Sequence, residues 1–279
     1  MAITFIPEIW SAKMLVSLKK SLVFAQPGVV NRDYEGDIAN AGDTVRIKSL
    51  NRPTIGTYTK NSTTITPETL TDAQRSLLID QAKYFAFEVD DIDAAQSVGG
   101  DLQTALQEAA YGLRDVADQY VASLYTGAAS ANQIGTVSVT TAALAYTQLR
   151  KLATKLDEAN VPQEGRYVIV PPWYYGLLLE DDKFVRVDAS GTSEGLRNGV
   201  VGMALGFDVM KSNNCVLVTG DDYAVQAGHP SAIAYAEQIV KVESYRPESA
   251  FSDAVKGLHV YGAKLVRPDA IATVVASIT

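Results

Sequence analysis

The feature of this sequence that most constrains its fold is a long amphipathic helix, predicted over residues 101–126. Apolar side chains recur there three and four positions apart, and charged or amide side chains occupy the opposite face. Asp101 is a favourable N-cap, and Gly127 stands where a left-handed residue commonly ends a helix. At 1.5 Å per residue the helix is roughly 36 Å long, about the diameter of a small domain. Other elements must therefore pack along it.

The rest of the chain predicts shorter elements of both kinds. Helical spacing favours two further helices, over residues 141–159 and 173–179. Short apolar or alternating runs bounded by turn residues predict strands at 167–170, 207–210, 215–218, 224–227, 239–242, 258–261 and 270–278. The predicted class is α+β with a mixed sheet.

Residues 1–43 predict an N-terminal arm. Apolar residues from Ile9 to Val23 fall roughly on helical spacing, and Pro27-Gly28 ends that pattern. A single short helix followed by coil has no core of its own, so the arm must pack on another surface. Two arrangements remain open: the arm packs on its own subunit, or it lies on a neighbour.

Residues 44–90 predict an extended β-hairpin. Thr44–Lys48 and Phe85–Asp90 alternate apolar and polar residues, and the eight threonines between them favour extended structure without demanding burial. Ordering such appendages costs about 1–2 kcal/mol per residue for the backbone alone. Burial against neighbouring subunits recovers roughly 25 cal/mol per Å² of apolar surface. The two appendages therefore predict a subunit of an obligate assembly.

Composition narrows the class of protein further. The 279 residues include 24 Lys and Arg against 32 Asp and Glu, a net charge of −8, which argues against nucleic-acid binding driven by net charge. The single cysteine, Cys215, cannot form an internal disulfide, which fits a reducing compartment. The sequence has no apolar run long enough to span a membrane and no signal-peptide pattern. We expect a soluble intracellular chain.

The residues around each candidate catalytic or metal site argue against that site. The G-x-S-x-G spacing at residues 191–195 matches a hydrolase nucleophile elbow, but the strand before it and the helix after it are missing from the pattern. Two histidines and one cysteine cannot supply a zinc site. We expect His229 in a turn, His259 half-exposed on a strand, and Cys215 in the core. The sequence predicts neither an enzyme nor a bound cofactor or metal.

Five segments, taken in order, resemble the major capsid (coat) proteins of tailed phages with the Hong Kong 97-type fold. They are Ile6–Ser11 with Val30–Gly36, Gly42–Ile47, Phe85–Ile92, Asn198–Asn213 and Arg246–Lys264, and the resemblance extends over nearly the whole chain in the family's order. The resemblance implies five regions: an N-terminal arm (1–43), an extended loop (44–90), a peripheral domain (91–160) with its spine helix at 101–126, an axial domain (161–245), and return strands to the peripheral domain (246–279).

The resemblance also implies a function. Such subunits self-assemble into hexamers and pentamers that form an icosahedral head around double-stranded DNA, without sequence-specific binding. Implied partners are further copies of the chain, a separate scaffold protein, a portal and decoration proteins, but no membrane. The implied location is the virion, preceded by the host cytoplasm. An encapsulin-type nanocompartment, built on the same fold, is the alternative.

The arm and the extended loop supply the predicted contacts between subunits. Aromatic, apolar and basic side chains on these two segments are the candidates, and they are Trp10, Leu15, Arg46, Lys48, Arg52, Tyr58 and Lys60.

Overall fold

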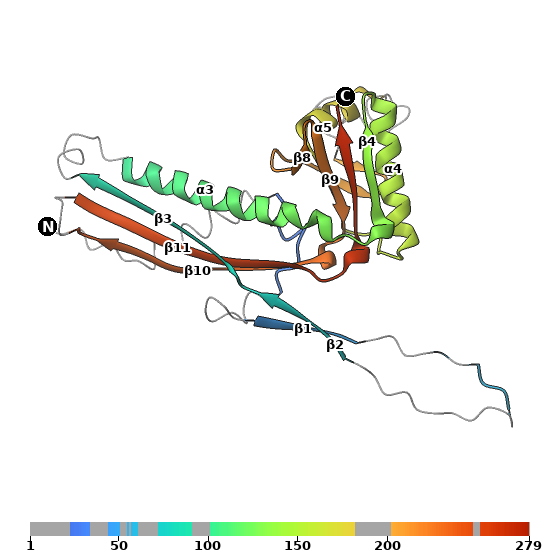
Figure 1. Cartoon of the computed structure of the whole chain (residues 1–279), viewed down its shortest axis with the longest axis horizontal. Helices are drawn as coiled ribbons and strands as arrows, with labels where there is room; N and C mark the ends of the chain where they lie inside the picture. The colour runs from blue at the N-terminus through green and yellow to red at the C-terminus, as the bar shows by residue number, and fades with distance from the viewer. Residues whose placement is uncertain are drawn as a thin grey trace.

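The computed structural model describes residues 23–33, 44–50, 55, 57–60, 72–90, 101–181, 202–247 and 252–278. A long helix lies along a three-stranded sheet, and a larger mixed sheet with two helices stands at one end of that helix (Figure 1). A two-stranded hairpin projects away from both sheets. The α+β class is confirmed.

The elements have the following bounds. The helices are α3 (Asp101–Ser123), α4 (Ala142–Glu158) and α5 (Pro172–Glu180). Short 3-10 turns lie at Leu124–Gly127, Ser130–Asn132, Pro230–Ala232 and Pro268–Ala270. The strands are β1 (Thr44–Leu50), β2 (Asp72–Leu78), β3 (Gln81–Asp90), β4 (Gln133–Ser138), β5 (Arg166–Val170), β6 (Met203–Ala204), β7 (Phe207–Lys211), β8 (Leu217–Thr219), β9 (Asp222–Gly228), β10 (Ile233–Tyr245), β11 (Ser252–Leu265) and β12 (Ile271–Ser277).

Helix α3 covers one face of the three-stranded sheet, whose strand order is β10–β11–β3. Its apolar stripe buries against both neighbouring strands, in a cluster made of Leu106, Ala110, Leu113 and Val255 with the partly buried Phe85 and Phe87. Gly257 on β11 lies beneath the ring of Phe85, so that any side chain there would overlap the ring. The long helix is thus held by its predicted apolar face.

The end of α3 differs from the predicted end. Regular α-helix stops at Ser123, and the chain tightens into the 3-10 turn that ends at Gly127. Gly127 is not among the glycines with a positive φ. A Cβ at this position would lie 3.0 Å from Cδ2 of Leu265, so the glycine packs closely on β11 and does not form a left-handed cap.

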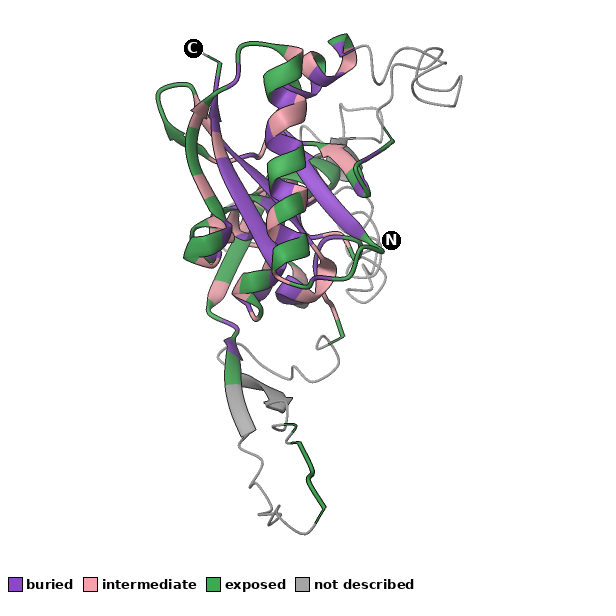
Figure 2. Cartoon of the chain, turned by 90° about the vertical axis from the view of Figure 1, so that its right-hand side faces the viewer, coloured by how far each residue is buried: buried purple, intermediate pink, exposed green. Residues whose placement is uncertain are grey.

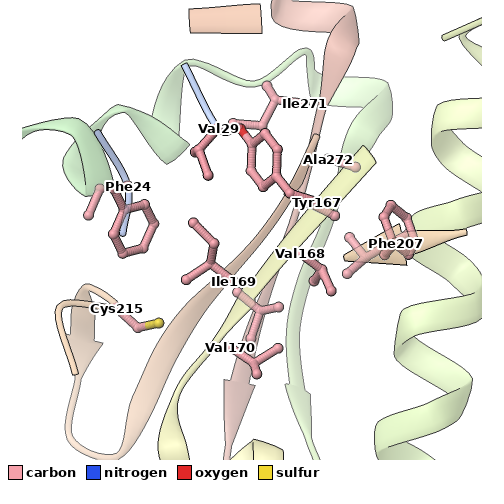
Figure 3. Close-up of a cluster of buried hydrophobic side chains, with 14 of the residues drawn as sticks. Phe24, Val29, Tyr167, Val168, Ile169, Val170, Phe207, Cys215, Ile271 and Ala272 are labelled. Carbon is pink, nitrogen blue, oxygen red and sulfur yellow. The ribbon is translucent and has the colours of Figure 1, made fainter. Parts of the chain in front are cut away.

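The larger sheet is mixed, with the order β4–β12–β9–β5–β7–β6, and β8 pairs with β9 off this path. All five residues of β5 are buried, because side chains cover both faces of this central strand. Helices α4 and α5 lie on one face, where the hydroxyl of Tyr174 donates to the carbonyl of Ala145 over 2.7 Å. On the other face, Ile169 lies on the side of Phe24 and Cys215 (Figure 3).

The described part of the arm, residues 23–33, packs on its own subunit. Phe24, Ala25, Val29 and Val30 are each only 1% exposed and belong to the main core. Asn31 adds a parallel bridge to Ala234 at the edge of β10. Of the two arrangements that the sequence left open, residues 23–33 therefore adopt the one in which the arm packs on its own subunit. Residues 1–22 and 34–43 lie outside the described residues.

The hairpin pairs differently from its predicted form. Strand β1 pairs with β2, from Thr44 opposite Leu78 to Leu50 opposite Asp72. The predicted return strand, Phe85–Asp90, lies instead in β3 and pairs with β11. The prediction was wrong because the two phenylalanines of β3 bury beneath α3, a contact that a projecting hairpin could not provide.

Candidate assembly interface

The hairpin projects away from both sheets and contacts β11 through β2 (Figures 1 and 2). Beyond the paired strands, Ile55 is 84% exposed, Tyr58 is 66% exposed and Lys60 is also exposed. Two large apolar side chains on one projecting segment are unfavourable in water unless another molecule covers them. The tip is therefore a candidate surface for contact with a second subunit.

The root of the hairpin, residues 77–79, crosses the three-stranded sheet on the face opposite α3. Tyr261 on β11 contacts Tyr120 of α3 with 5.6 Å between ring centroids, so its neighbours Val260 and Gly262 point to the other face. There Leu77 and Ile79 are buried in a cluster with Ala234, Ala236 and Val260. A Cβ at Gly262 would overlap the carbonyl oxygen of Leu78 and lie 3.0 Å from Cα of Ile79. The backbone of the root thus rests directly on β11.

The predicted contact residues are only partly within the described chain. Tyr58 and Lys60 lie exposed near the tip. Arg46 and Lys48 lie on β1, at the register positions of Ser76 and Gln74 of β2. Trp10, Leu15 and Arg52 lie outside the described residues. The role of all seven in assembly stays a prediction.

A buried polar cluster joins the arm to the sheet. The guanidinium of Arg32 lies 2.9 Å from Oε1 of Glu237, and Cζ of Arg32 lies 4.9 Å from the ring centroid of Tyr235. The hydroxyl of Tyr235 donates to Oε2 of Glu237 over 2.9 Å. His259 Nε2 lies 3.4 Å from the same carboxylate oxygen. The expectation that His259 is half-exposed was wrong, because the register of β11 turns it toward the α3 face, where it is 1% exposed.

This cluster has a strong effect on the charge of Glu237. Burial alone would raise the pKa of its carboxyl group. The contact with His259, the charge of Arg32 and the hydrogen bond from Tyr235 outweigh burial and lower that pKa to about 2. No pattern in the sequence could have indicated the pair, because Arg32 and Glu237 lie 205 positions apart.

The structure does not bring together the residues of the other candidate sites, catalytic or metal-binding, within the ranges that it describes. The G-x-S-x-G segment lies outside the described residues. His229 lies at the start of a 3-10 turn, which confirms the expectation that it is a turn residue. Its Nδ1 lies 2.8 Å from Oγ of Ser231. Across the ranges that the structure describes, no group of three His, Cys, Asp or Glu residues could hold a metal ion. Among the helices described, none is both long enough and apolar enough to cross a membrane.

Cys215 is buried in the core, as predicted, and its thiol should be unreactive in the folded protein. Burial, with a smaller contribution from the charge of Asp118, raises the pKa of the thiol to about 12, which disfavours the reactive thiolate. We expect labelling by a thiol reagent at pH 7 to be slow until denaturant is added. Because the chain has one cysteine, the signal has a single source. Rapid stoichiometric labelling without denaturant would show that Cys215 is accessible.

Comparison with known proteins identifies the family. Residues 73–274 match the family model described as phage capsid protein. The chain belongs to the phage capsid protein family. A solved structure from Mycobacterium phage Che8 is 33% identical to this capsid protein, covers 91% of each chain and has a TM-score of 0.77. No curated protein sequence matches this chain.

Two more distant structures show the same fold. The capsid of the cyanophage P-SCSP1u is 18% identical, covers 94% of this chain and 90% of its own, and has a TM-score of 0.74. A virus-like particle from Pyrococcus furiosus is 15% identical, covers 96% and 98% of the two chains, and has a TM-score of 0.57. The predicted Hong Kong 97-type fold is confirmed. The protein is a capsid shell protein and a component of the virion.

Proposed function

We propose that this capsid protein is the subunit that closes into hexamers and pentamers and builds an icosahedral head around the double-stranded DNA of a tailed phage. The observation that carries the proposal is the projecting hairpin, whose Ile55 and Tyr58 are 84% and 66% exposed and are not covered by the described residues of their own chain. A lattice of identical subunits provides such cover at every position. The net charge of −8 suits a container that holds DNA without adhering to it.

The proposal includes the division into arm, extended loop, peripheral domain and axial domain, and a structural rather than an enzymatic role. It also includes assembly in the host cytoplasm, with a scaffold protein, a portal and decoration proteins as partners. Trp10, Leu15, Arg46, Lys48, Arg52, Tyr58 and Lys60 are the proposed contacts between subunits.

Electron microscopy of the purified protein tests assembly. Closed shells in which units of five and six subunits can be distinguished would support the proposal. A stable monomer of 29.9 kDa at every concentration, with or without the other head proteins, would contradict it. Nuclease-protected double-stranded DNA in particles from infected cells would support the proposed content.

Deletion of residues 54–71 should abolish shell formation while leaving the subunit folded. The deletion removes the distal part of the hairpin but keeps β1 and β2, which end at Leu50 and resume at Asp72. Circular dichroism and thermal unfolding should be unchanged, and particles should be absent from sedimentation profiles. An intact particle of normal size would refute the role of the hairpin.

A finer test compares two exposed neighbours on the tip. Tyr58→Ser should weaken each subunit contact by about 2 kcal/mol if the ring is a buried anchor in the shell. Thr57→Ser, at the neighbouring exposed position, is the control and should leave the critical concentration for assembly unchanged. Equal critical concentrations for both variants would remove Tyr58 from the proposed contacts.

The alternative function is an enzyme nanocompartment. It is favoured by the likeness to the Pyrococcus furiosus virus-like particle over nearly the full length of both chains. The content of the particles separates the two functions, because a nanocompartment would enclose a protein cargo and a phage head would enclose DNA.

A further inference from the structure

One carboxylate holds the start of the arm segment 23–33 on the long helix. Asp118 on α3 is 3% exposed, and its Oδ1 accepts hydrogen bonds from the backbone N–H groups of Val23 and Phe24, over 2.9 and 2.7 Å. The side chain of Phe24 enters the main core on the face of the larger sheet where Ile169 lies (Figure 3). The segment thus contacts both α3 and the larger sheet where it begins.

The second oxygen of the same carboxylate binds the larger sheet. Oδ2 of Asp118 accepts a hydrogen bond over 3.0 Å from Nδ2 of Asn214, in the turn between β7 and β8. The same Nδ2 donates to Oδ1 of Asp115, three residues earlier on α3, over 2.8 Å. The turn is fixed to the sheet, because the backbone N–H of Ser212 donates to the carbonyl of Val170 over 3.0 Å. Asp118 therefore joins α3, the arm and the larger sheet.

The cost of burying this carboxylate is shared between the two sets of donors. Burial raises the pKa of Asp118, and the hydrogen bonds from Asn214 and from the arm backbone oppose that rise. A buried charged oxygen that loses its donor is more unfavourable than an exposed one, because water cannot replace the donor. While the arm covers Asp118, the hydrogen bond from Asn214 therefore contributes more than it would with the arm released.

A cavity beside the carboxylate gives water a route to it. The cavity has a volume of about 190 Å³, lies between α3 and the β7–β8 turn, and is partly open to solvent. Val23, Asp118 and Asn214 are among the residues that line it. Withdrawal of Val23 would widen the cavity toward the carboxylate, so that water could replace the hydrogen bonds of the arm and compete with that of Asn214.

We propose that Asp118 couples docking of the arm to the seating of the β7–β8 turn on α3. Each contact strengthens the other, so displacement of residues 23–33 loosens the junction between α3 and the larger sheet. A coupling free energy is reciprocal, so the factor by which loss of the Asn214 bond weakens arm docking is also the factor by which arm release weakens that bond. A force applied to the chain before Val23 would reach the bonds to Asp118 first.

Hydrogen exchange measured by mass spectrometry on the full chain at pH 7 tests the coupling. In Asn214→Ala, the open fraction of the peptide spanning residues 23–33 should rise about tenfold, the factor that corresponds to the loss of a hydrogen bond to a charged group. The backbone N–H of Asn31, which donates to β10 over 2.8 Å, reports docking at the end of the segment away from Asp118. A peptide from β5, which is buried at all five positions, is the internal reference. An unchanged open fraction would overturn the proposal.

Asn213→Ala is the matched control, because it makes the same change at the neighbouring, exposed position of the same turn. It should leave the open fraction of residues 23–33 at the value of the parent. An equal rise in Asn213→Ala and Asn214→Ala would assign the effect to the turn as a whole rather than to the bond with Asp118, and the proposal would be wrong.

Asp118→Asn tests whether the coupling runs through the carboxylate. Asparagine keeps the shape of the side chain but has one oxygen, which cannot accept from the arm and from Asn214 at their two separate positions. Added to Asp118→Asn, the substitution Asn214→Ala should therefore change the open fraction of residues 23–33 by less than about twofold. A further tenfold rise in the double variant would show that the coupling takes another route, and would refute the proposal.

If Asp118→Asn does not fold, the comparison of Asn214→Ala with Asn213→Ala still decides the question, because both changes lie in a turn at the surface of the cavity. None of these measurements requires the chain to form a shell.

Discussion

Gly262→Ala is expected to detach the root of the hairpin from the sheet. The new methyl group would overlap the backbone of Leu78 and approach that of Ile79, and backbone atoms cannot rotate away as a side chain would. Strand β2 must then lift from β11, which exposes Leu77 and Ile79, at present 0% and 2% exposed. Burial of each such side chain stabilises a protein by about 1.5–3 kcal/mol, so the free energy of unfolding should fall by about 3–6 kcal/mol.

Chemical denaturation followed by circular dichroism measures this loss. Gly202→Ala is the matched control, because a Cβ at Gly202 meets no atom of the described residues within 4 Å and its φ is not positive. The control should change the unfolding free energy by less than about 0.5 kcal/mol. If Gly262→Ala were equally mild, the hairpin root could not rest on β11 as closely as described.

Leu113→Arg is expected to prevent stable folding. Leu113 is 6% exposed and lies between α3 and the three-stranded sheet, in the cluster with Val255 and two phenylalanines. Arginine would place an unpaired charge in this apolar contact, and burial of such a charge commonly costs more than about 4 kcal/mol. The expected result is an insoluble product or a collapse of the thermal transition.

Gln107→Arg introduces the same side chain on the exposed face of the same helix and is the control. It should leave solubility and the unfolding temperature close to those of the parent. A soluble Leu113→Arg variant that unfolds like Gln107→Arg would mean that the middle of α3 does not depend on its apolar stripe.

Local patterns predicted the elements whose burial repeats regularly along the chain. The period of α3 follows one continuous packing face, and Pro171-Pro172 separates β5 from α5 by a purely local constraint. The same reasoning misplaced the return strand of the hairpin. Residues 72–78 carry little alternation of apolar and polar residues, and of the β2 residues whose exposure the structure describes only Leu77 is buried. Residues 85–90 alternate strongly, and Phe85 and Phe87 pack under α3.

Local sequence patterns could not predict the buried polar cluster of Arg32, Tyr235, Glu237 and His259, for a different reason. Alternation gives the face of a strand on which His259 lies, but only the pairing of β11 with β10 and the docking of the arm decide that this face is covered. The same holds for Arg32 and Glu237, which meet only in the folded chain. For the candidate interface, the sequence indicated the exposed tip with Tyr58 and Lys60, because polar β-favouring runs need no fold to be recognised.

The position of β12 in the larger sheet determines when, during synthesis, the subunit can complete that sheet. β12 lies between β4 and β9, and among the described strands β4 pairs with β12 alone. Thr273 pairs with Gln133, which was synthesised 140 residues earlier. At the usual rate of translation, β4 therefore waits roughly 7–28 s for its partner. A nascent chain in which β12 has not yet been synthesised has an unfinished sheet, so it cannot present this sheet complete to a growing particle.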